Sequence, residues 1–380
     1  MCLLVVIGTI LWATSQNVSE IHAADGSEYL SSATEKHENG DLKGAIADYT
    51  RYISIQSNVP YAYHRRAHAR HHSGDYAGAI ADYTMALELY PTSEDLYYDR
   101  GIAKHDKGDY AGAVADYTKA IELKPVNPWS YYNRGNSKRF MKDWDGAIAD
   151  YLKTLEQRPN DADAYHNIGV SKAAKKDWGG ALLEYDKALK LKPGDPLALS
   201  NRGWTRMQLG DTDASISDYN EAVRLGPDSF DAHYGRAIVR RSAGDFDGAI
   251  SDSTRAIELR PVSADAYCNR GVLKVDKGDF DGGIEDYDKA ISLNPGDAQI
   301  YGNRGFAFLN KRELDRSLAD YDKSIQLVAN EPRTHYYRAQ VRALKGDFDG
   351  AIADFDMSLE LRPNEARTFY GRAMAKRLKG

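Results

Sequence analysis

The chain of 380 residues is long enough for two or three globular domains of ~150 residues each. Apolar residues make up 42% of it, which argues against disorder, and a net charge of −6 provides no basic surface for nucleic acid. Its two cysteines exclude a disulfide-stapled scaffold. Tyr and Gly are unusually abundant, at 26 and 32 residues, and both follow the repeat described below.

The N-terminal segment resembles an export signal. The apolar run from Leu3 to Ala13 is shorter than the ~20 residues of a membrane span and has the length of a signal-peptide core. Small residues follow it at Ala13 and at Ala23-Ala24, although no basic segment precedes it. We expect residues 1–25 to direct export, which places the mature chain in a bacterial periplasm or in the secreted fraction, without insertion into the membrane. The alternatives are a cytoplasmic protein with a buried N-terminal helix and a chain anchored in a membrane by its N-terminus.

The rest of the chain follows a period of 34 residues. The dipeptide Gly-Asp, or a Lys-Asp or Arg-Glu pair in its place, recurs ten times at this spacing without insertion or deletion. With the dipeptide at positions 15 and 16, ten repeats fill residues 26–365. An eleventh begins at Ala366 and stops at Gly380. Residues 366–380 are therefore interpreted as a half repeat or a capping helix, or as a reading frame that stops early.

Each repeat is expected to form two helices. In residues 264–297, Tyr267 and Gly271 share one face of a first helix. Gly278 is expected to stop this helix because glycine tolerates left-handed backbone angles, and Asp279 is a favourable N-cap for a second one. Pro295 then ends the second helix.

This pattern resembles the tetratricopeptide repeat, and the resemblance covers residues 26–380. The family's aromatic position 4 is occupied here mostly by Tyr, and its small position 8 is Ala or Gly in every repeat. The resemblance implies an all-α fold in which antiparallel helix pairs stack into a right-handed superhelical solenoid. It also implies a concave groove, lined by the first helices, that binds another protein or an extended peptide.

Position 7 departs from the family, where it is usually Leu. Arg occupies it in nine of eleven repeats, and position 11 is Lys or Arg in all but one. Position 23 on the second helix is always acidic. We expect a structural ladder in which each arginine pairs with a position-23 carboxylate. The alternative is an anion-binding track, which requires arginines that the carboxylates do not neutralise.

Two groups of groove residues are candidate peptide-binding residues. Asn carries both donors and an acceptor, so a column of Asn can hold the backbone of an extended peptide, as in the repeat arm of O-linked N-acetylglucosamine transferase, which this column resembles. The alternative is an Asn bonded to water or within the solenoid. At position 6 the column comprises Asn133, Asn167, Asn201, Asn269 and Asn303. Position 5 adds aromatic surface through Tyr98, Tyr132, Tyr234, Tyr336 and Tyr370.

Six of the ten histidines are expected to converge on the groove near the second repeat. They are His64, His68, His71 and His72 at positions 5, 9, 12 and 13, with His37 and His105 at position 12 of the flanking repeats. Imidazole binds Zn, Ni or Cu, and Glu38 and Asp106 can complete such a shell. The same histidines can act as a pH sensor, or simply as a polar contact surface.

No catalytic motif accompanies these features: the sequence lacks a nucleophile elbow, a phosphate-binding glycine loop and paired zinc cysteines. We therefore expect a non-enzymatic scaffold or adaptor that needs no cofactor. The alternative is a metal- or pH-responsive binding protein that uses the histidines.

Overall fold

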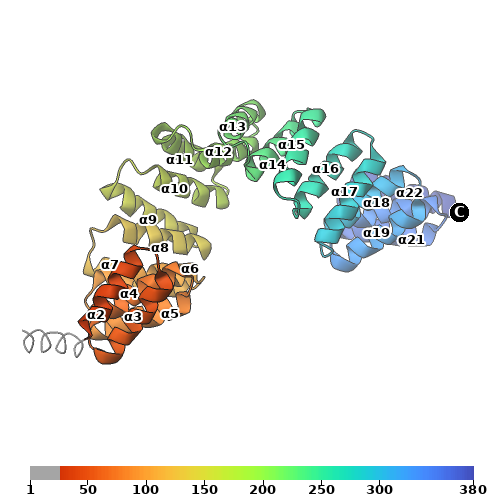
Figure 1. Cartoon of the computed structure of the whole chain (residues 1–380). Helices are drawn as coiled ribbons and strands as arrows, with labels where there is room; N and C mark the ends of the chain where they lie inside the picture. The colour runs from red at the N-terminus through yellow and green to blue at the C-terminus, as the bar shows by residue number, and fades with distance from the viewer. Residues whose placement is uncertain (1–25) are drawn as a thin grey trace, which may run out of the picture. The chain divides into compact units, whose positions relative to one another are not determined.

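The computed structural model describes residues 26–380, and the export segment expected over residues 1–25 lies outside them. The described residues form 21 α-helices, arranged as ten antiparallel pairs followed by a single helix (Figure 1). The all-α class and the two helices per repeat are thus confirmed. Within residues 26–380, no helix is both long and apolar enough to cross a membrane.

The chain divides into two compact units. The described part of the first unit, residues 26–191, holds repeats one to five. Its helices are α2 (Ser27–Glu38), α3 (Leu42–Ile55), α4 (Pro60–His72), α5 (Tyr76–Leu89), α6 (Glu94–Asp106), α7 (Tyr110–Leu123), α8 (Pro128–Phe140), α9 (Trp144–Gln157), α10 (Ala162–Ala174) and α11 (Trp178–Leu191).

The second unit, residues 192–380, holds the remaining repeats. Its helices are α12 (Pro196–Gln208), α13 (Thr212–Leu225), α14 (Phe230–Ser242), α15 (Phe246–Leu259), α16 (Ala264–Asp276), α17 (Phe280–Leu293), α18 (Ala298–Asn310), α19 (Leu314–Leu327), α20 (Pro332–Leu344), α21 (Phe348–Leu361) and α22 (Ala366–Lys379).

The Gly-Asp dipeptide forms the turn within seven of the ten pairs. Gly74 follows α4 with a φ of 83°, and the N–H of Asp75 donates to the carbonyl of Arg70 at 2.9 Å, as in a Schellman motif. The side chain of Asp75 then accepts from the N–H of Gly78 at 2.9 Å and caps α5. One dipeptide therefore ends the first helix and starts the second, which explains why its spacing never varies.

Three turns adopt the same left-handed conformation without glycine. Lys142, Lys176 and Arg312 have φ values of 62°, 63° and 63°, and they are the three residues that replace glycine at position 15. A non-glycine residue costs about 1–2 kcal/mol in this region. The turn geometry is therefore imposed by the repeat and not by its local sequence.

In nine of the ten pairs the core is a ring packed on a small residue; the seventh repeat has Ser253 in place of the ring. Tyr151 of α9 is fully buried, and a Cβ added to Gly135 of α8 would lie 2.9 Å from its ring. The same approach joins Tyr185 to Gly169 and Tyr287 to Gly271. Position 8 is small because the position-24 ring occupies the space of a side chain.

The single helix α22 packs against α20 and α21. It buries Thr368 and Ala375, while Tyr370 is 70% exposed and Leu378 56% exposed. The polar outer face expected of a solvating cap is thus interrupted by apolar and aromatic side chains. The pattern of α22 is that of a first helix of the repeat.

Candidate functional site

The predicted arginine ladder is confirmed in both units. In eight repeats the position-7 guanidinium donates two hydrogen bonds to the position-23 carboxylate of the same repeat, with Nη2 to Oδ1 distances of 2.6–2.7 Å. Arg66 also donates through Nη1 to the hydroxyl of Thr50 in the preceding repeat at 3.0 Å. The ladder therefore joins neighbouring repeats as well as the two helices of one repeat.

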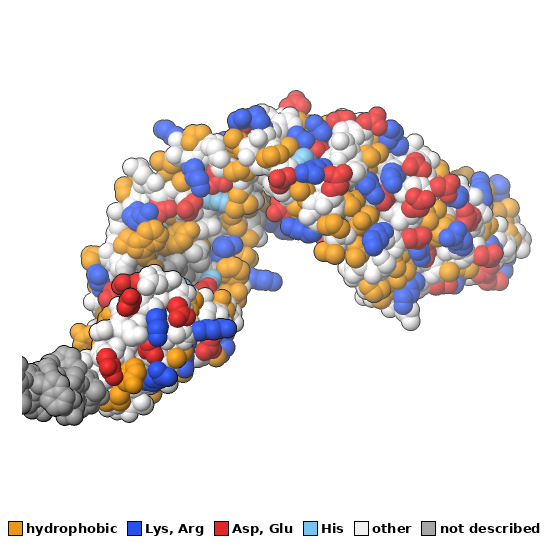
Figure 2. Space-filling view, viewed as in Figure 1, with side chains coloured by type: hydrophobic (Ala, Val, Ile, Leu, Met, Phe, Trp, Pro, Cys, Tyr) orange, Lys and Arg blue, Asp and Glu red, His pale blue; other side chains and the backbone are white. Residues whose placement is uncertain are grey.

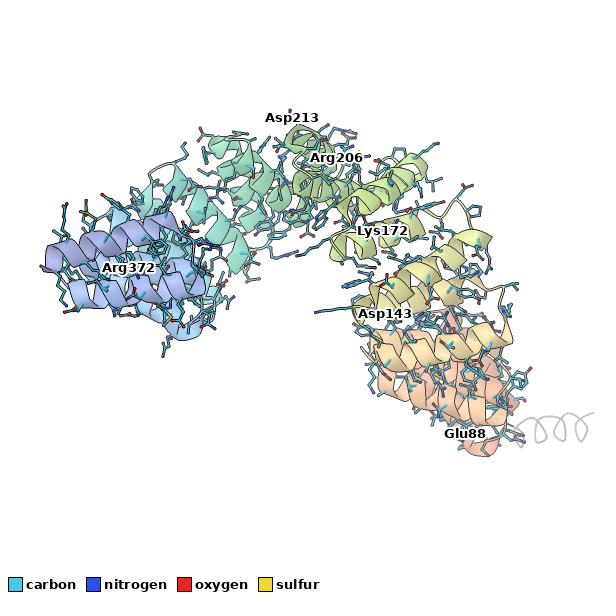
Figure 3. The ribbon with its side chains drawn as sticks, turned by 180° about the vertical axis from the view of Figure 1, so that it is seen from behind. Glu88, Asp143, Lys172, Arg206, Asp213 and Arg372 are labelled. Carbon is cyan, nitrogen blue, oxygen red and sulfur yellow. The ribbon has the colours of Figure 1, made fainter. Side chains whose placement is uncertain are left out.

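The position-11 cation reaches the same carboxylate. Lys172 of α10 lies 2.8 Å from Glu184, and Arg206 of α12 lies 2.8 Å from Asp218 (Figure 3). Because the carboxylates neutralise these cations, the ladder excludes the anion-binding track along positions 7 and 11.

The position-6 asparagines join consecutive repeats. The amide nitrogen of Asn133 donates to the hydroxyl of Tyr98 at 2.9 Å, and that of Asn167 donates to Tyr132 at 3.0 Å. Asn303 makes the same step to the Sγ of Cys268 at 3.6 Å. One amide donor of each is thus used inside the solenoid, which leaves the second N–H or the side-chain oxygen for a ligand.

The other two asparagines are placed differently. Asn269 donates to the hydroxyl of Ser253 at 3.1 Å, and Asn201 lies half-buried at the equivalent position of α12. The column therefore follows one face of the first helices without making one uniform contact.

Four of the five position-5 tyrosines are half-buried and engaged with neighbours, whereas Tyr370 is exposed. Burial raises the pKa of Tyr98 and of Tyr132. Tyr234 stacks on Phe230, with ring centroids 5.5 Å apart, and burial raises its pKa too. Tyr336 accepts from the amide of Gln340 at 2.9 Å. These four rings are therefore packed within the repeat array, and their role in peptide binding stays a prediction.

The ninth repeat contains a hollow on the groove face. In five other repeats the position-5 ring packs on the position-24 ring of its own repeat, as Tyr132 does on Tyr151 at 5.7 Å. Position 5 of the ninth repeat is Gly302, and a Cβ there would meet only the Ser324 hydroxyl, at 3.7 Å. A cavity of about 640 Å³ opens at this point, lined by Gln299, Gly302, Asn303, Phe306, Arg333 and Tyr337 among others.

Tyr321 forms part of the wall of this cavity. Its ring is 1% exposed and stacks on Tyr337 of the next repeat, with centroids 6.0 Å apart and planes within 8°. The hydroxyl of Tyr321 is buried without a hydrogen-bond partner among the described residues, and burial raises its pKa. An unpaired buried hydroxyl costs about 1–3 kcal/mol, which a polar group of a ligand can recover.

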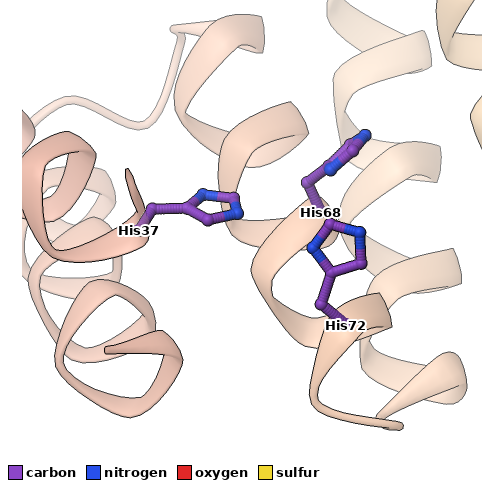
Figure 4. A group of neighbouring side chains, drawn as sticks. All are labelled: His37, His68 and His72. Carbon is purple, nitrogen blue, oxygen red and sulfur yellow. The ribbon is translucent and has the colours of Figure 1, made fainter. Parts of the chain in front are cut away.

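Four of the six predicted histidines gather near the second repeat. The ligand atoms of His37, His68 and His72 lie within 4.8 Å of one another (Figure 4). Those of His64, His68 and Asp99 also lie within 4.8 Å of one another. His37 extends from α2, whereas the other histidines are on α4. The i, i+4 spacing placed the α4 residues on one face, as the sequence predicts.

The other two histidines belong to neither group. His71 lies 2.7 Å from Asp106, and His105 lies 2.8 Å from the Ser137 hydroxyl. Asp99 was not predicted as a member of the cluster. It occupies position 6 of the third repeat, and its Oδ2 lies 2.7 Å from His64, across the same 35 residues that separate Asn133 from Tyr98. The position-6 column was the signal that could have identified it.

Burial favours the neutral form of two of the clustered histidines. Desolvation lowers the pKa of His68 to about 4, against the opposing charge of Asp99 and with the help of the neighbouring histidines. Desolvation also lowers the pKa of His37, followed by the charge of Arg65. Neutral imidazole is the form that binds a metal ion.

The surface of each unit mixes charges of both signs. Acidic and basic side chains alternate on the visible face, with hydrophobic side chains between them (Figure 2). This distribution agrees with the overall charge of −6 and gives no extended basic face in this view.

Family models match most of the chain. A model described as a TPR repeat matches residues 67–108 and 103–138. A model described as a tetratricopeptide repeat matches residues 132–196, 201–265 and 307–366, and a further one with that description matches residues 264–297. These matches identify no catalytic domain. No curated protein matches the chain.

Several solved structures resemble it. MamA is 32% identical over 42% of this chain and 94% of its own, with a TM-score of 0.40. YrrB, titled a TPR protein with an unusual peptide-binding site, is 26% identical over 52% of this chain and 97% of its own, with a TM-score of 0.42. The APC/C hetero-tetramer Cut9-Hcn1 is 14% identical over 94% of this chain and 98% of that chain, with a TM-score of 0.52, and shares the fold.

Proposed function

Because the chain belongs to the tetratricopeptide repeat family, we propose that it is a non-enzymatic scaffold or adaptor that holds an extended segment of a partner protein on its groove face. The observation that carries this proposal is the hollow at Gly302, which lies at the groove positions of the ninth repeat. Its volume of about 640 Å³ is within the ordinary range of ligand pockets.

The residues around the hollow indicate what it accepts. Phe306 and Tyr337 pack edge to face, with ring centroids 5.3 Å apart, and together form an aromatic wall against which an apolar or aromatic side chain of the peptide can pack. Asn303 and the unpartnered hydroxyl of Tyr321 provide polar contacts for the peptide backbone. A large anchor with a few convergent polar groups is typical of a peptide hot spot.

The hollow extends toward the C-terminal end of the second unit. A second cavity of about 320 Å³ shares Arg333 and Tyr337 with the first, and Tyr336, Arg362 and Arg367 also line it. An extended peptide can therefore place two side chains on either side of the shared residues. This path includes Asn303 and Tyr336, which the sequence identified as groove residues.

The test is to fill the hollow. Peptides selected on the full chain from a random library are titrated by fluorescence anisotropy against Gly302→Tyr, which restores the position-5 ring of other repeats. We expect affinity to fall at least ~10-fold, or about 1.4 kcal/mol. Glu285→Tyr, at an exposed site on the second helix α17, is the matched control and should bind as the wild type does. Equal binding by Gly302→Tyr would remove the hollow from the proposal.

The asparagine column needs a separate test. We expect weaker binding of a peptide that lies across the substituted position in each of three variants: Asn133→Ala, Asn167→Ala and Asn201→Ala. Tyr98→Phe is the control for Asn133→Ala, because it removes the internal hydrogen bond while keeping the amide. If Tyr98→Phe weakens binding as much as Asn133→Ala does, the amide acts through the solenoid and not on the peptide.

We also propose that residues 1–25 direct export, as the apolar run from Leu3 to Ala13 suggests. Cell fractionation of the native bacterium, with mass spectrometry of the mature N-terminus, tests this. Recovery of the uncut chain from the cytoplasm would contradict it, and recovery of the uncut chain from membranes would indicate an anchor.

A further inference from the structure

We propose that His37, His68 and His72 form a site for a borderline transition-metal ion of the Zn²⁺ or Cu²⁺ type, between the first helices of repeats one and two. This inference is independent of the peptide-binding proposal, because the hollow at Gly302 belongs to the other unit.

The three imidazoles are close to a metal-binding arrangement. Their ring centroids are 6.2 Å apart for His37 and His68, 6.1 Å for His37 and His72, and 5.1 Å for His68 and His72. A tetrahedral ion with Zn–N bonds of ~2.0–2.1 Å needs nitrogens ~3.3 Å apart. The nitrogens now lie within 4.8 Å of one another, so side-chain rotations of His37 and His72 can close the site without moving a helix (Figure 4).

A second observation points to a ligand at the same place. Nδ1 of His37 is buried and has no hydrogen-bond partner among the described residues. Such an atom carries a desolvation cost that the repeat array does not offset. A metal ion, or a water molecule bound to one, would satisfy it.

The contact between His64 and Asp99 is explained by the repeat structure, because it links two neighbouring repeats. The grouping of His37, His68 and His72 has no such explanation. The contact of 2.7 Å between His64 and Asp99 spans 35 residues, from position 5 of one repeat to position 6 of the next, like the bond between Tyr98 and Asn133. Asp99 also lies 3.9 Å from Nε2 of His68. This distance is too long for a hydrogen bond, so Asp99 does not fix which ring nitrogen of His68 would face the ion.

The surrounding charges and the ligand type determine which ions the site favours. Arg65 contributes an unfavourable positive potential at His37, whereas Glu38 contributes a favourable one. His72 is exposed, so water can complete the coordination. Three imidazoles suit Zn²⁺, Ni²⁺ and Cu²⁺ and disfavour Mg²⁺ and Ca²⁺, and Cu²⁺ should bind most tightly among these ions.

Calorimetry on the untagged full chain tests the site. Titration with ZnCl₂ should show saturable binding of one ion, and His37→Ala or His72→Ala should each weaken it at least ~10-fold. His105→Ala is the matched control, because that histidine is bound to Ser137 and belongs to neither group. It should bind Zn²⁺ as the wild type does. Far-UV circular dichroism of each variant establishes that it is folded.

His64→Ala decides between the two histidine groups. We expect it to retain most of the Zn²⁺ affinity, because His64 contributes no bond to the ion. Loss of binding in His64→Ala with binding retained in His37→Ala would overturn the assignment in favour of His64, His68 and Asp99. Absence of saturable binding by Zn²⁺ and by Cu²⁺ would overturn the proposal altogether.

Discussion

The second and ninth repeats are built on the same frame and differ in what they present on the groove face. Arg66 pairs with Asp82 in one and Arg304 with Asp320 in the other, with nearly equal distances of 2.6 and 2.7 Å. Position 5 is His64 in the second repeat and Gly302 in the ninth. The frame therefore leaves the groove positions free to vary, and both proposed binding sites use those positions.

The groove residues of the two repeats lead to opposite kinds of surface. His68 at position 9 of the second repeat contributes to the histidine cluster that we propose as a metal site, whereas Phe306 at the same position of the ninth lines an open cavity. The physical cause is local: an imidazole fills the space above the position-24 ring, whereas glycine leaves it empty.

The largest expected effect comes from breaking the shared frame. Arg66 and Arg70 lie 2.6 and 2.8 Å from the Asp82 carboxylate. Asp82→Ala leaves both cations without this partner, so it should lower the free energy of unfolding by about 3–5 kcal/mol. Asp320→Ala should lower the free energy of unfolding by less, because position 11 of the ninth repeat is Phe308 and not a cation. Arg304 also keeps its contact with Asp288. Urea denaturation measures both.

The control for these variants is an exposed ion pair between repeats. Asp145 pairs with Lys175 and is 79% exposed, so Asp145→Ala should change the free energy of unfolding by no more than about 0.5 kcal/mol. Equal losses in all three variants would show that the buried ladder is no more important than the surface pairs.

The burial of position 5 can be measured through Cys268. Burial raises the pKa of this thiol to about 11, so its thiolate fraction at pH 8 is about a hundredfold below that of an ordinary cysteine. We expect alkylation by iodoacetamide to be slower by about this factor than in the urea-unfolded chain. The rate should rise about tenfold per pH unit until the pH approaches 11. Mass spectrometry of the Cys268 peptide follows the reaction, and fast alkylation at pH 8 would show that position 5 is open to solvent.

A smaller effect is expected at the turn. Lys176→Gly should raise the free energy of unfolding by about 1 kcal/mol, because φ at this residue is 63°. The reverse change in the other unit, Gly244→Ala, should lower it by a similar amount, since φ is 81° and a Cβ there meets nothing within 4 Å. Thermal unfolding of both variants tests the effect, and a loss of stability in Lys176→Gly would contradict it.

The smallest expected effect comes from adding a methyl group at Gly302, which lines the hollow. Gly302→Ala should stabilise the chain by about 0.5–1 kcal/mol, because glycine within a helix is unfavourable and its Cβ has room. Gly135→Ala should destabilise it, because the new Cβ would lie 2.9 Å from the ring of Tyr151. The opposite signs, measured in the same denaturant, would distinguish an empty groove position from a packed one.

The sequence by itself determined the repeat frame. The helix ends, the left-handed turns and the pairing of Arg66 with Asp82 all follow from residues that recur every 34 positions, because each depends on contacts within one repeat. The i, i+4 spacing in α4 likewise predicted that His64, His68 and His72 share a face.

Only the tertiary structure decided which groove side chains meet across repeats. It showed that the amide of Asn133 donates a hydrogen bond to the Tyr98 hydroxyl. It also showed that Asp99, and not Asp106, contacts His64, and that a cavity lies beside Gly302 and Tyr321. These outcomes depend on side-chain directions in two helices from adjacent repeats. A 34-residue period places such residues near one another, but the rotamers and the volumes of their neighbours determine which of them touch.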